Sequence, residues 1–200
     1  MMKLYITYTS PFARVARVVV IEKGLQDRVE IIEAKTRTVG SPYYAINPSG
    51  RVPYLVTDDG VAFEDSHVIS TYLDNLDGKP RLRPAKDPAW EYVRLEASAR
   101  SMTDGISVWG REMKRPENER SPTVLAHEVA RAGRMADLFE TQVEQPLMQG
   151  SLNIAQLLLA TGLDYGAGSG FKGLTEGRPR LTAWHRRMQE LPSMIATRAP

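Results

Sequence analysis

Apolar and polar residues in the first part of the chain change from strand-like to helix-like spacing and back. Residues 3–8 are rich in β-forming side chains and end at Thr-Ser-Pro, which is typical of a strand that leads into a helix. Apolar positions then recur at helical spacing as far as Gly24, and residues 29–32 form a second β-rich run. Because a strand, a helix and a second strand fit a right-handed crossover, the two strands are predicted to be parallel neighbours.

A hairpin and another helix complete this first region. Residues 53–56 and 61–63 are short β-rich runs on either side of an Asp-Asp-Gly sequence, which is a strong hairpin signal. A helix is then expected from Ser66 to the residue before Gly78, with its apolar side chains on one stripe. Residues 1–78 therefore predict one small mixed α/β domain.

The pattern becomes helical after Gly78. Residues 79–86 contain closely spaced prolines and are interpreted as a linker, and residues 87–200 are predicted to form an all-α domain. Two long helices are expected to begin at Asp87-Pro88 and Ser121-Pro122, since a capping residue followed by proline is a common helix start. Shorter helices are expected over residues 153–161 and 179–190.

Composition supports a folded protein and argues against a polyanionic partner. The chain has 200 residues, of which 42% are hydrophobic and 25% charged, as in an average globular protein. Its 26 basic and 24 acidic residues leave a formal charge of +2, so neither nucleic acid nor an anionic membrane is expected as a partner. The apolar runs are too short for a membrane span and the N-terminus has no signal pattern, so a cytoplasmic protein is expected.

The absence of cysteine limits the chemistry. It excludes structural disulfides, thiolate metal sites and attack by a thiol of the protein itself, so any sulfur chemistry requires a sulfur from the substrate. The three histidines show no metal-binding spacing, and no metal site is predicted. The glycine-rich residues 168–173 match a dinucleotide fingerprint in letters, but a helix precedes them, so they are interpreted as a loop between helices.

Several short motifs occur in a characteristic order along the chain. They are Thr9-Ser10-Pro11-Phe12, residues 47–53 (Asn-Pro-Ser-Gly-Arg-Val-Pro), Asp65-Ser66, residues 151–156 and Pro179-Arg180-Leu181 with Trp184. In this order and spacing, almost the whole chain resembles the cytosolic glutathione transferase family, in particular its bacterial branch with a Ser or Thr hydroxyl. The resemblance implies a thioredoxin-like N-terminal domain, an all-helical second domain, glutathione as co-substrate, no tightly bound cofactor and a homodimer.

The resemblance gives Ser10 the central role. A helix N-terminus carries about half a positive charge, which favours a thiolate placed there, and the Ser10 hydroxyl is expected to donate a hydrogen bond to the glutathione sulfur. Other branches of the family use a hydroxyl one residue earlier or a tyrosine at the end of the first strand, which makes Thr9 and Tyr8 the alternatives. A purely structural role for Ser10 as a helix cap is also open.

Two other segments, Val52-Pro53 and Asp65-Ser66, are expected to hold glutathione. The resemblance implies a cis bond between Val52 and Pro53, with the Val52 backbone pairing with the cysteinyl segment of glutathione like an added strand. Asp65-Ser66 resembles the pair that binds the γ-glutamyl end, although Asp65 stands where the family commonly has Glu or Gln. A structural alternative is a trans proline at an edge strand and a plain helix cap at Asp65 or Ser66.

Further side chains are expected around the two substrates. Arg51 lies where the family often has a group near the glycyl carboxylate, with Lys35 or Arg37 as helpers, and Phe12 is counted among the glutathione-binding residues. The electrophile is expected between the domains, against the long helix that starts near Asp87. Its candidate walls are Phe12, Met102, Ile106 and Trp109, although such residues at helical spacing are often core.

The sixth helix of the family usually begins with Ser or Thr followed three residues later by Asp. Asn153 and Gln156 stand there in this chain, and they are expected to form a reciprocal capping box. This is a structural role, and no catalytic role is assigned to it.

The favoured function is transfer of glutathione to an electrophilic, mostly apolar co-substrate. The alternatives are a glutathione-dependent isomerase or peroxidase of the same fold, and a non-catalytic protein-interaction module. The lack of cysteine counts against the isomerase branch, which typically has a Ser-Ser-Cys run at the first helix. The presence of Ser10, Val52-Pro53 and Asp65-Ser66 favours an enzyme over the interaction module.

Overall fold

A computed structural model of the chain describes residues 1–77, 81–84 and 89–199, and they fall into two units. The first unit contains residues 1–83 together with the C-terminal residues from Pro192, and the second spans Pro84–Leu191. The sequence placed the C-terminal residues in the helical domain. They group with the first unit instead, because the Arg14 guanidinium donates a hydrogen bond to the carbonyl oxygen of Met194 at 2.8 Å.

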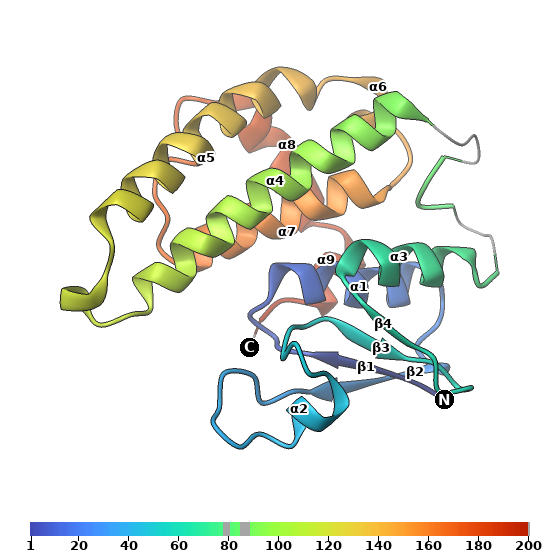
Figure 1. Ribbon diagram of the computed structural model, residues 1–200. Helices are drawn as coiled ribbons and strands as arrows, with labels where there is room; N and C mark the ends of the chain where they lie inside the picture. Colours follow the sequence, from blue (N-terminus) through green and yellow to red (C-terminus); the bar gives the residue numbers. More distant parts are fainter. Residues whose placement is uncertain (78–80, 85–88, 200) are drawn as a thin grey trace. The chain divides into compact units, whose positions relative to one another are not determined.

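The first unit is built on a four-stranded mixed sheet in the order β2-β1-β3-β4 (Figure 1). β1 and β2 are parallel, as predicted, whereas β3 is antiparallel to both β1 and β4. The strands are β1 (Met2–Ile6), β2 (Val29–Glu33), β3 (Tyr54–Val56) and β4 (Ala62–Glu64). This is the thioredoxin-like arrangement that the sequence implied.

Helices cover both faces of this sheet. α1 (Pro11–Glu22) and α3 (Ser66–Asn75) pack against one another on one face, where Leu4 and Ile6 of β1 are fully buried. Tyr5 points to the opposite face, as strand geometry requires, and its ring lies 5.7 Å from that of Tyr43 in α2 (Tyr43–Ile46). A further short helix, α9 (Pro192–Ala196), lies along α1.

The ends of α1 follow the sequence signals. Ser10 caps its N-terminus and Pro11 occupies the first helical position, where a missing N–H costs nothing. Gly24 has a φ of 62°, the left-handed conformation that commonly ends a helix. The side chain of Lys23, at the C-terminal end, is fully buried and lies 2.9 Å from Asp77 and 3.4 Å from Asp74. This ion-pair cluster joins the C-terminal ends of α1 and α3.

The second unit consists of helices. Its central helix is α7 (Ile154–Gly168), which packs against α4 (Trp90–Met113) and α8 (Pro179–Gln189) and is buried over most of its circumference. A helix that is apolar all round is expected at the centre of a bundle. The remaining elements are η1 (Glu117–Glu119), α5 (Pro122–Gln142) and α6 (Pro146–Gln149).

The capping box at α7 is confirmed. The Asn153 side chain accepts a hydrogen bond from the Gln156 N–H at 3.1 Å, and the Gln156 side chain accepts one from the Asn153 N–H at 2.8 Å. Both residues are buried, and so is Trp184, whose indole N–H donates to the carbonyl oxygen of Met148. The helix expected after α7 is therefore anchored by Trp184.

The helix bounds differ from those predicted from the sequence. The helix expected over residues 153–161 runs to Gly168, and the expected start at Asp87-Pro88 lies outside the described residues, with α4 described from Trp90. A Cβ added to Gly162 would collide with the Thr103 hydroxyl oxygen. This glycine marks a close approach of α7 to α4 rather than a helix end.

Candidate functional site

Strand register brings the predicted site segments to one edge of the sheet. Tyr5 of β1 pairs with Tyr54 of β3, and Tyr54 pairs with Glu64 of β4. These residues lie at the end of β1, the start of β3 and the end of β4. The segments 7–10, 51–53 and 65–66 therefore all adjoin the same edge, although they are far apart in sequence.

Ser10 occupies the N-terminus of α1 as its cap. Its side-chain oxygen accepts a hydrogen bond from the Ala13 N–H at 3.2 Å, and its carbonyl accepts from the Arg14 N–H at 2.9 Å. A serine hydroxyl has one donor in addition to its acceptor lone pairs. Within the described residues the Ser10 hydroxyl donates to no partner. Capping the helix and donating to a ligand at its N-terminus are thus compatible roles for one side chain.

The two alternatives to Ser10 lie in different surroundings. The Thr9 side chain is exposed, and Tyr8 is half-buried with its ring centroid 4.9 Å from the guanidinium carbon of Arg17. Phe12, in the first turn of α1, is also half-buried. Tyr8 is therefore packed against the side of α1, whereas Ser10 lies at its end.

The segment before β3 is held by a set of hydrogen bonds that the sequence interpretation missed. The Arg51 carbonyl oxygen accepts from the Tyr43 hydroxyl at 2.5 Å and from the Asn47 side-chain amide at 3.0 Å. Burial raises the pKa of Tyr43 to about 12, so the phenol stays a donor at neutral pH. Asn47 belongs to the motif that suggested the family, but only the fold reveals its structural task.

Gly50 fixes the path of the same segment. Its φ is 66°, and an added Cβ would lie 2.6 Å from the Cε1 atom of Tyr44. Its N–H donates to the Asn47 carbonyl at 3.0 Å, and the Asn47 side chain in turn accepts from the Ser49 N–H. Both the left-handed conformation and the close approach require glycine here.

The Val52-Pro53 peptide bond is cis, as expected. Pro53 is buried and Val52 half-buried, just before the first paired residue of β3, Tyr54. Among the residues that the structure describes, none hydrogen-bonds to the Val52 N–H or carbonyl. Val52, two residues before β3, thus has its backbone hydrogen-bonding groups available, which pairing with an added strand requires.

Asp65 caps α3 in a strained conformation. Its φ is 73° and its ψ 127°, and its carboxylate accepts from the His67 N–H at 2.7 Å. Positive φ in a residue other than glycine costs free energy and occurs preferentially at functional sites. Ser66 follows as the first helical residue and is buried. The N-termini of α1 and α3 thus both lie at this edge, where helix ends favour anionic groups.

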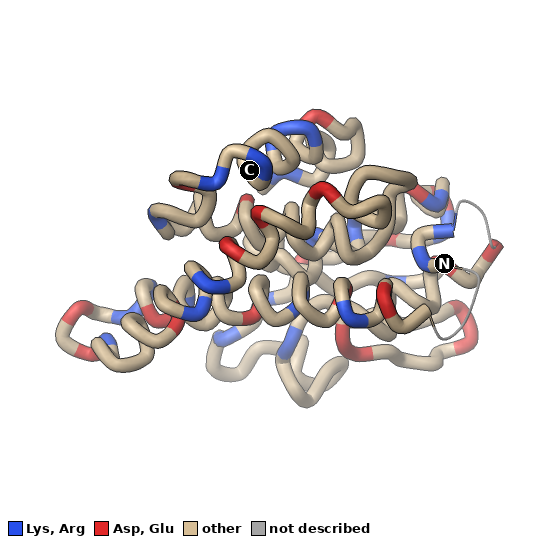
Figure 2. Tube along the Cα trace, turned by 90° about the horizontal axis from the view of Figure 1, so that it is seen from above, with Lys and Arg blue, Asp and Glu red and all other residues tan. Residues whose placement is uncertain are grey.

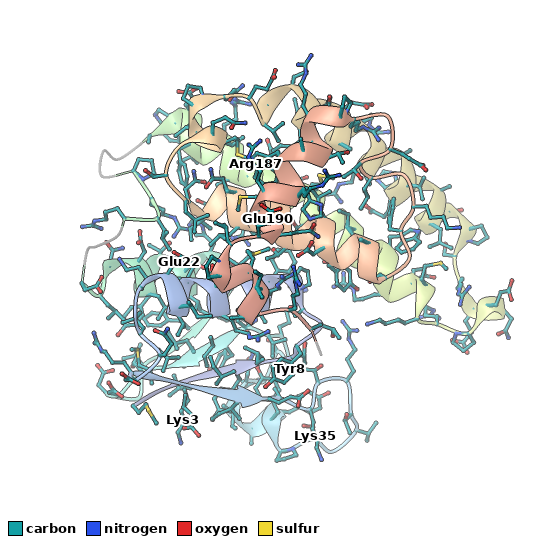
Figure 3. All side chains as sticks on the ribbon, turned by 180° about the vertical axis from the view of Figure 1, so that it is seen from behind. Lys3, Tyr8, Glu22, Lys35, Arg187 and Glu190 are labelled. Carbon is teal, nitrogen blue, oxygen red and sulfur yellow. The ribbon has the colours of Figure 1, made fainter. Side chains whose placement is uncertain are left out.

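The basic side chains near this edge are exposed. Arg51, Lys35 and Arg37 all lie at the surface, and Arg37 also has a positive φ of 57°. Because β2 runs parallel to β1, Lys35 leaves the sheet at the same end as Tyr8, whereas Lys3 lies toward the other end (Figure 3). Lysines and arginines are interspersed with acidic residues along the trace rather than gathered in one segment (Figure 2).

The side chains suggested for the electrophile belong to the second unit. Met102 and Ile106 are fully buried, and the Ile106 Cγ2 atom lies 3.1 Å from where a Cβ on Gly166 would be. The Trp109 ring is 4.5 Å from the Phe171 ring. Ile106 and Trp109 therefore have packing partners within their own unit. Phe171 lies in the glycine-rich loop after α7, which the sequence analysis interpreted as a connection between helices.

The described residues contain neither a metal-binding cluster nor a membrane-spanning helix. No group of three or more His, Cys, Asp or Glu side chains is placed to hold a metal ion. None of the described helices combines the length and apolar character that crossing a bilayer requires.

Comparison with known proteins matches this architecture to one family. Residues 4–81 match the family model of the glutathione S-transferase N-terminal domain. An uncharacterised GST-like protein of Escherichia coli, YibF, is 30% identical over 167 residues, which cover 82% of this chain and 81% of that protein. The chain belongs to the glutathione S-transferase family.

Solved structures extend the agreement to both units. A glutathione S-transferase from Methylobacillus flagellatus with glutathione bound is 27% identical, with a TM-score of 0.89 over all of both chains. A family member from Pseudomonas fluorescens, also with glutathione bound, is 26% identical with a TM-score of 0.91 over all of both chains. The glutathione S-transferase fold, with its thioredoxin-like and helical domains, is thereby confirmed.

Proposed function

We propose that the protein is a glutathione transferase that stabilises the thiolate of glutathione at the N-terminus of α1. The observation that carries the proposal is the Ser10 hydroxyl, which accepts from the Ala13 N–H and keeps its proton for a ligand. The relatives with bound glutathione supply the identity of that ligand. Ser10 then acts as a hydrogen-bond donor and not as a base, because a serine alkoxide is far too basic to persist at neutral pH.

The rest of glutathione follows the sheet edge. The cysteinyl segment pairs with the Val52 backbone, whose position is fixed by the hydrogen bonds on the Arg51 carbonyl oxygen. The γ-glutamyl end binds at Asp65-Ser66, where the Asp65 carboxylate attracts its amino group and the N-terminus of α3 attracts its carboxylate. Arg51 and its basic neighbours Lys35 and Arg37 are assigned to the glycyl carboxylate. The proposal thus assigns glutathione to four segments that adjoin one edge of the sheet, with charged groups expected at its two carboxylate ends.

The proposed reaction is nucleophilic substitution or addition at an electrophilic carbon. In the substitution, the sulfur forms a bond to the carbon, the leaving group departs with the electron pair of the broken bond, and the thiol proton is released to solvent. The protein contributes the lowered thiol pKa and the proximity of the two reactants. Phe12, Met102, Ile106 and Trp109 are the side chains proposed to line the co-substrate site.

A pH profile identifies the group that activates the thiol. We would measure kcat/KM for a neutral aryl halide at saturating glutathione in the wild type and in Ser10→Ala, Thr9→Ala and Tyr8→Phe. The acidic limb of the profile reports the pKa of the reacting thiol. It should move to higher pH in Ser10→Ala alone. A shift in Thr9→Ala or Tyr8→Phe, with Ser10→Ala unchanged, would transfer the role to that residue.

The oligomeric state is a second proposal from the family. We expect a homodimer, and sedimentation at micromolar concentration measures it directly. A monomer under these conditions would contradict this expectation without affecting thiol activation. Glutathione binding without turnover of any electrophile would instead favour a non-catalytic module of the same fold.

A further inference from the structure

Arg17 carries a half-buried guanidinium that no carboxylate among the described residues pairs with. Its Nη1 atom donates to the Thr197 carbonyl oxygen at 3.0 Å, and its guanidinium carbon lies 4.9 Å from the centre of the Tyr8 ring. In the parts of the chain that the structure describes, no Asp or Glu pairs with it. An arginine presents five N–H donors, and most of those of Arg17 have no partner among the residues that the structure describes.

The surroundings of Arg17 penalise its charge. Burial lowers the pKa of Arg17, the nearby Tyr8 works in the opposite direction, and the Arg14 guanidinium lowers it further. Arginine nevertheless stays protonated at neutral pH. A half-buried cation next to another cation is therefore a place where a bound anion would be stabilised, because the anion offsets both the lost hydration and the repulsion.

Arg17 reaches back toward the thiol site. It lies seven residues after Ser10, about 10 Å further along the axis of α1, but helical side chains lean toward the N-terminus of their helix. The contact with the Tyr8 ring is consistent with this direction, since Tyr8 precedes Ser10 by two residues. The guanidinium thus lies beside the segment that leads into the proposed thiolate site.

The two carboxylates of glutathione are assigned elsewhere. The γ-glutamyl end belongs to the N-terminus of α3, and the glycyl end to Arg51. Within the described parts of the chain, Arg17 interacts with Tyr8, Arg14 and Thr197, and not with either of those segments. An anion bound by Arg17 would therefore come from the second substrate.

We propose that Arg17 binds a carboxylate of the electrophilic co-substrate, so that the protein prefers anionic electrophiles to neutral ones of the same shape. This inference rests on the proposed transferase function and narrows its substrate class. The guanidinium fork matches a carboxylate in shape as well as charge, which gives two parallel hydrogen bonds. The Tyr8 ring beneath it holds the guanidinium plane in place through a cation–π contact.

A matched pair of electrophiles tests the proposal. The pair is a chlorodinitrobenzoate and its methyl ester, which differ in the charge of one substituent. The readout is the ratio of kcat/KM for the acid to kcat/KM for the ester, with each value corrected for the uncatalysed reaction with glutathione. The ester measures whether the protein is a transferase at all, so failure of the proposed function is distinguishable from failure of this inference.

Three variants of Arg17 separate charge from structure. Arg17→Met removes both the charge and the hydrogen bond to Thr197, Arg17→Gln keeps a donor for that carbonyl but no charge, and Arg17→Lys keeps a charge. We expect the acid-to-ester ratio to fall roughly 10- to 100-fold in the Met and Gln variants, the usual effect of losing a charge-assisted hydrogen bond. Arg17→Lys should retain part of the preference. Arg28→Met, at an exposed position before β2, is the control and should keep the wild-type ratio.

Three results would overturn the inference. The first is an unchanged ratio in both Arg17→Met and Arg17→Gln. The second is a loss in Arg17→Met that Arg17→Gln fully restores, because the hydrogen bond to Thr197 would then be the cause. The third is a rise in KM for glutathione with an unchanged acid-to-ester ratio, which would assign Arg17 to glutathione itself.

Discussion

Replacing Ser10 by alanine separates two roles that one hydroxyl performs, and the chain contains a matched control. Ser121 caps α5 as Ser10 caps α1: each is followed by proline, and each accepts a hydrogen bond from the N–H three residues later, at 3.3 Å for Ser121 and 3.2 Å for Ser10. The two substitutions therefore remove the same kind of cap. One of them also removes the proposed donor to sulfur.

The stability effects should be alike. Loss of a serine cap costs about 1 kcal/mol, which in a chain of this size lowers Tm by roughly 2–4 °C. Both Ser10→Ala and Ser121→Ala should show this decrease in a thermal or denaturant unfolding experiment. A much larger loss in Ser10→Ala would mean that the variant is misfolded and would require Ser10→Thr in its place.

The effects on glutathione should differ. A hydrogen bond to a charged group contributes about 1.5–3 kcal/mol, which corresponds to roughly one to two pKa units. In Ser10→Ala the pKa of the bound thiol should rise by this amount, and in Ser121→Ala it should stay at the wild-type value. The absorbance of the thiolate, followed as a function of pH at saturating glutathione, measures it. Equal thiol pKa values in the two variants would refute the role of Ser10.

Three other substitutions test the supports of the site. Gly50→Ala forces a left-handed alanine against a tyrosine ring, so the free energy of unfolding should fall by at least about 1–2 kcal/mol, as measured in urea; an unchanged midpoint would contradict this. Asp65→Asn keeps an oxygen for the helix cap but removes the charge, and it should raise KM for glutathione with little change in stability; an unchanged KM would show that the charge is not used. The pKa of Tyr43 is about 12 in the fold against 10 when unfolded. The stability that its burial confers is thus present below pH 10 and is lost as the pH rises toward 12, and Tyr43→Phe should flatten this decline in unfolding experiments.

The elements that the sequence predicted well are those with local signals. The Ser-Pro starts of α1 and α5, the Asp-Asp-Gly hairpin and the Asn153–Gln156 capping box each depend on residues a few positions apart. Such signals specify backbone geometry directly, through a side-chain hydrogen bond or a preferred φ. Their order along the chain was then enough to indicate the family.

The features that the sequence did not predict depend on contacts between residues far apart in the chain. The helix was expected to end just before Gly162, but Gly162 lies inside α7. A glycine is needed there because Thr103 of α4 leaves no room for a side chain. The short α9 has no strong pattern of its own and is held by Arg14, 180 residues earlier, through the carbonyl oxygen of Met194. Local propensity carries no information about either contact.

In the candidate site, too, some residues could be predicted from local motifs and others could not. Ser10, Val52-Pro53 and Asp65-Ser66 could be named from their motifs, whereas the hydrogen bonds of Tyr43 and Asn47 to the Arg51 carbonyl required the fold. Asn47 is part of the motif at residues 47–53, but that motif does not indicate which group its side chain binds. Arg17 had no sequence signal, because the lack of a carboxylate near it among the described residues is visible only in the fold.

The central claim is that the protein lowers the pKa of glutathione bound at α1. The most direct measurement is an ultraviolet titration of glutathione with the wild-type protein across pH, following thiolate absorbance. The free thiol is expected near the cysteine value of about 8.5. We predict saturable binding with the thiol pKa lowered by about one unit or more. Absence of saturable binding at millimolar glutathione, or a bound thiol with its free pKa, would contradict the account.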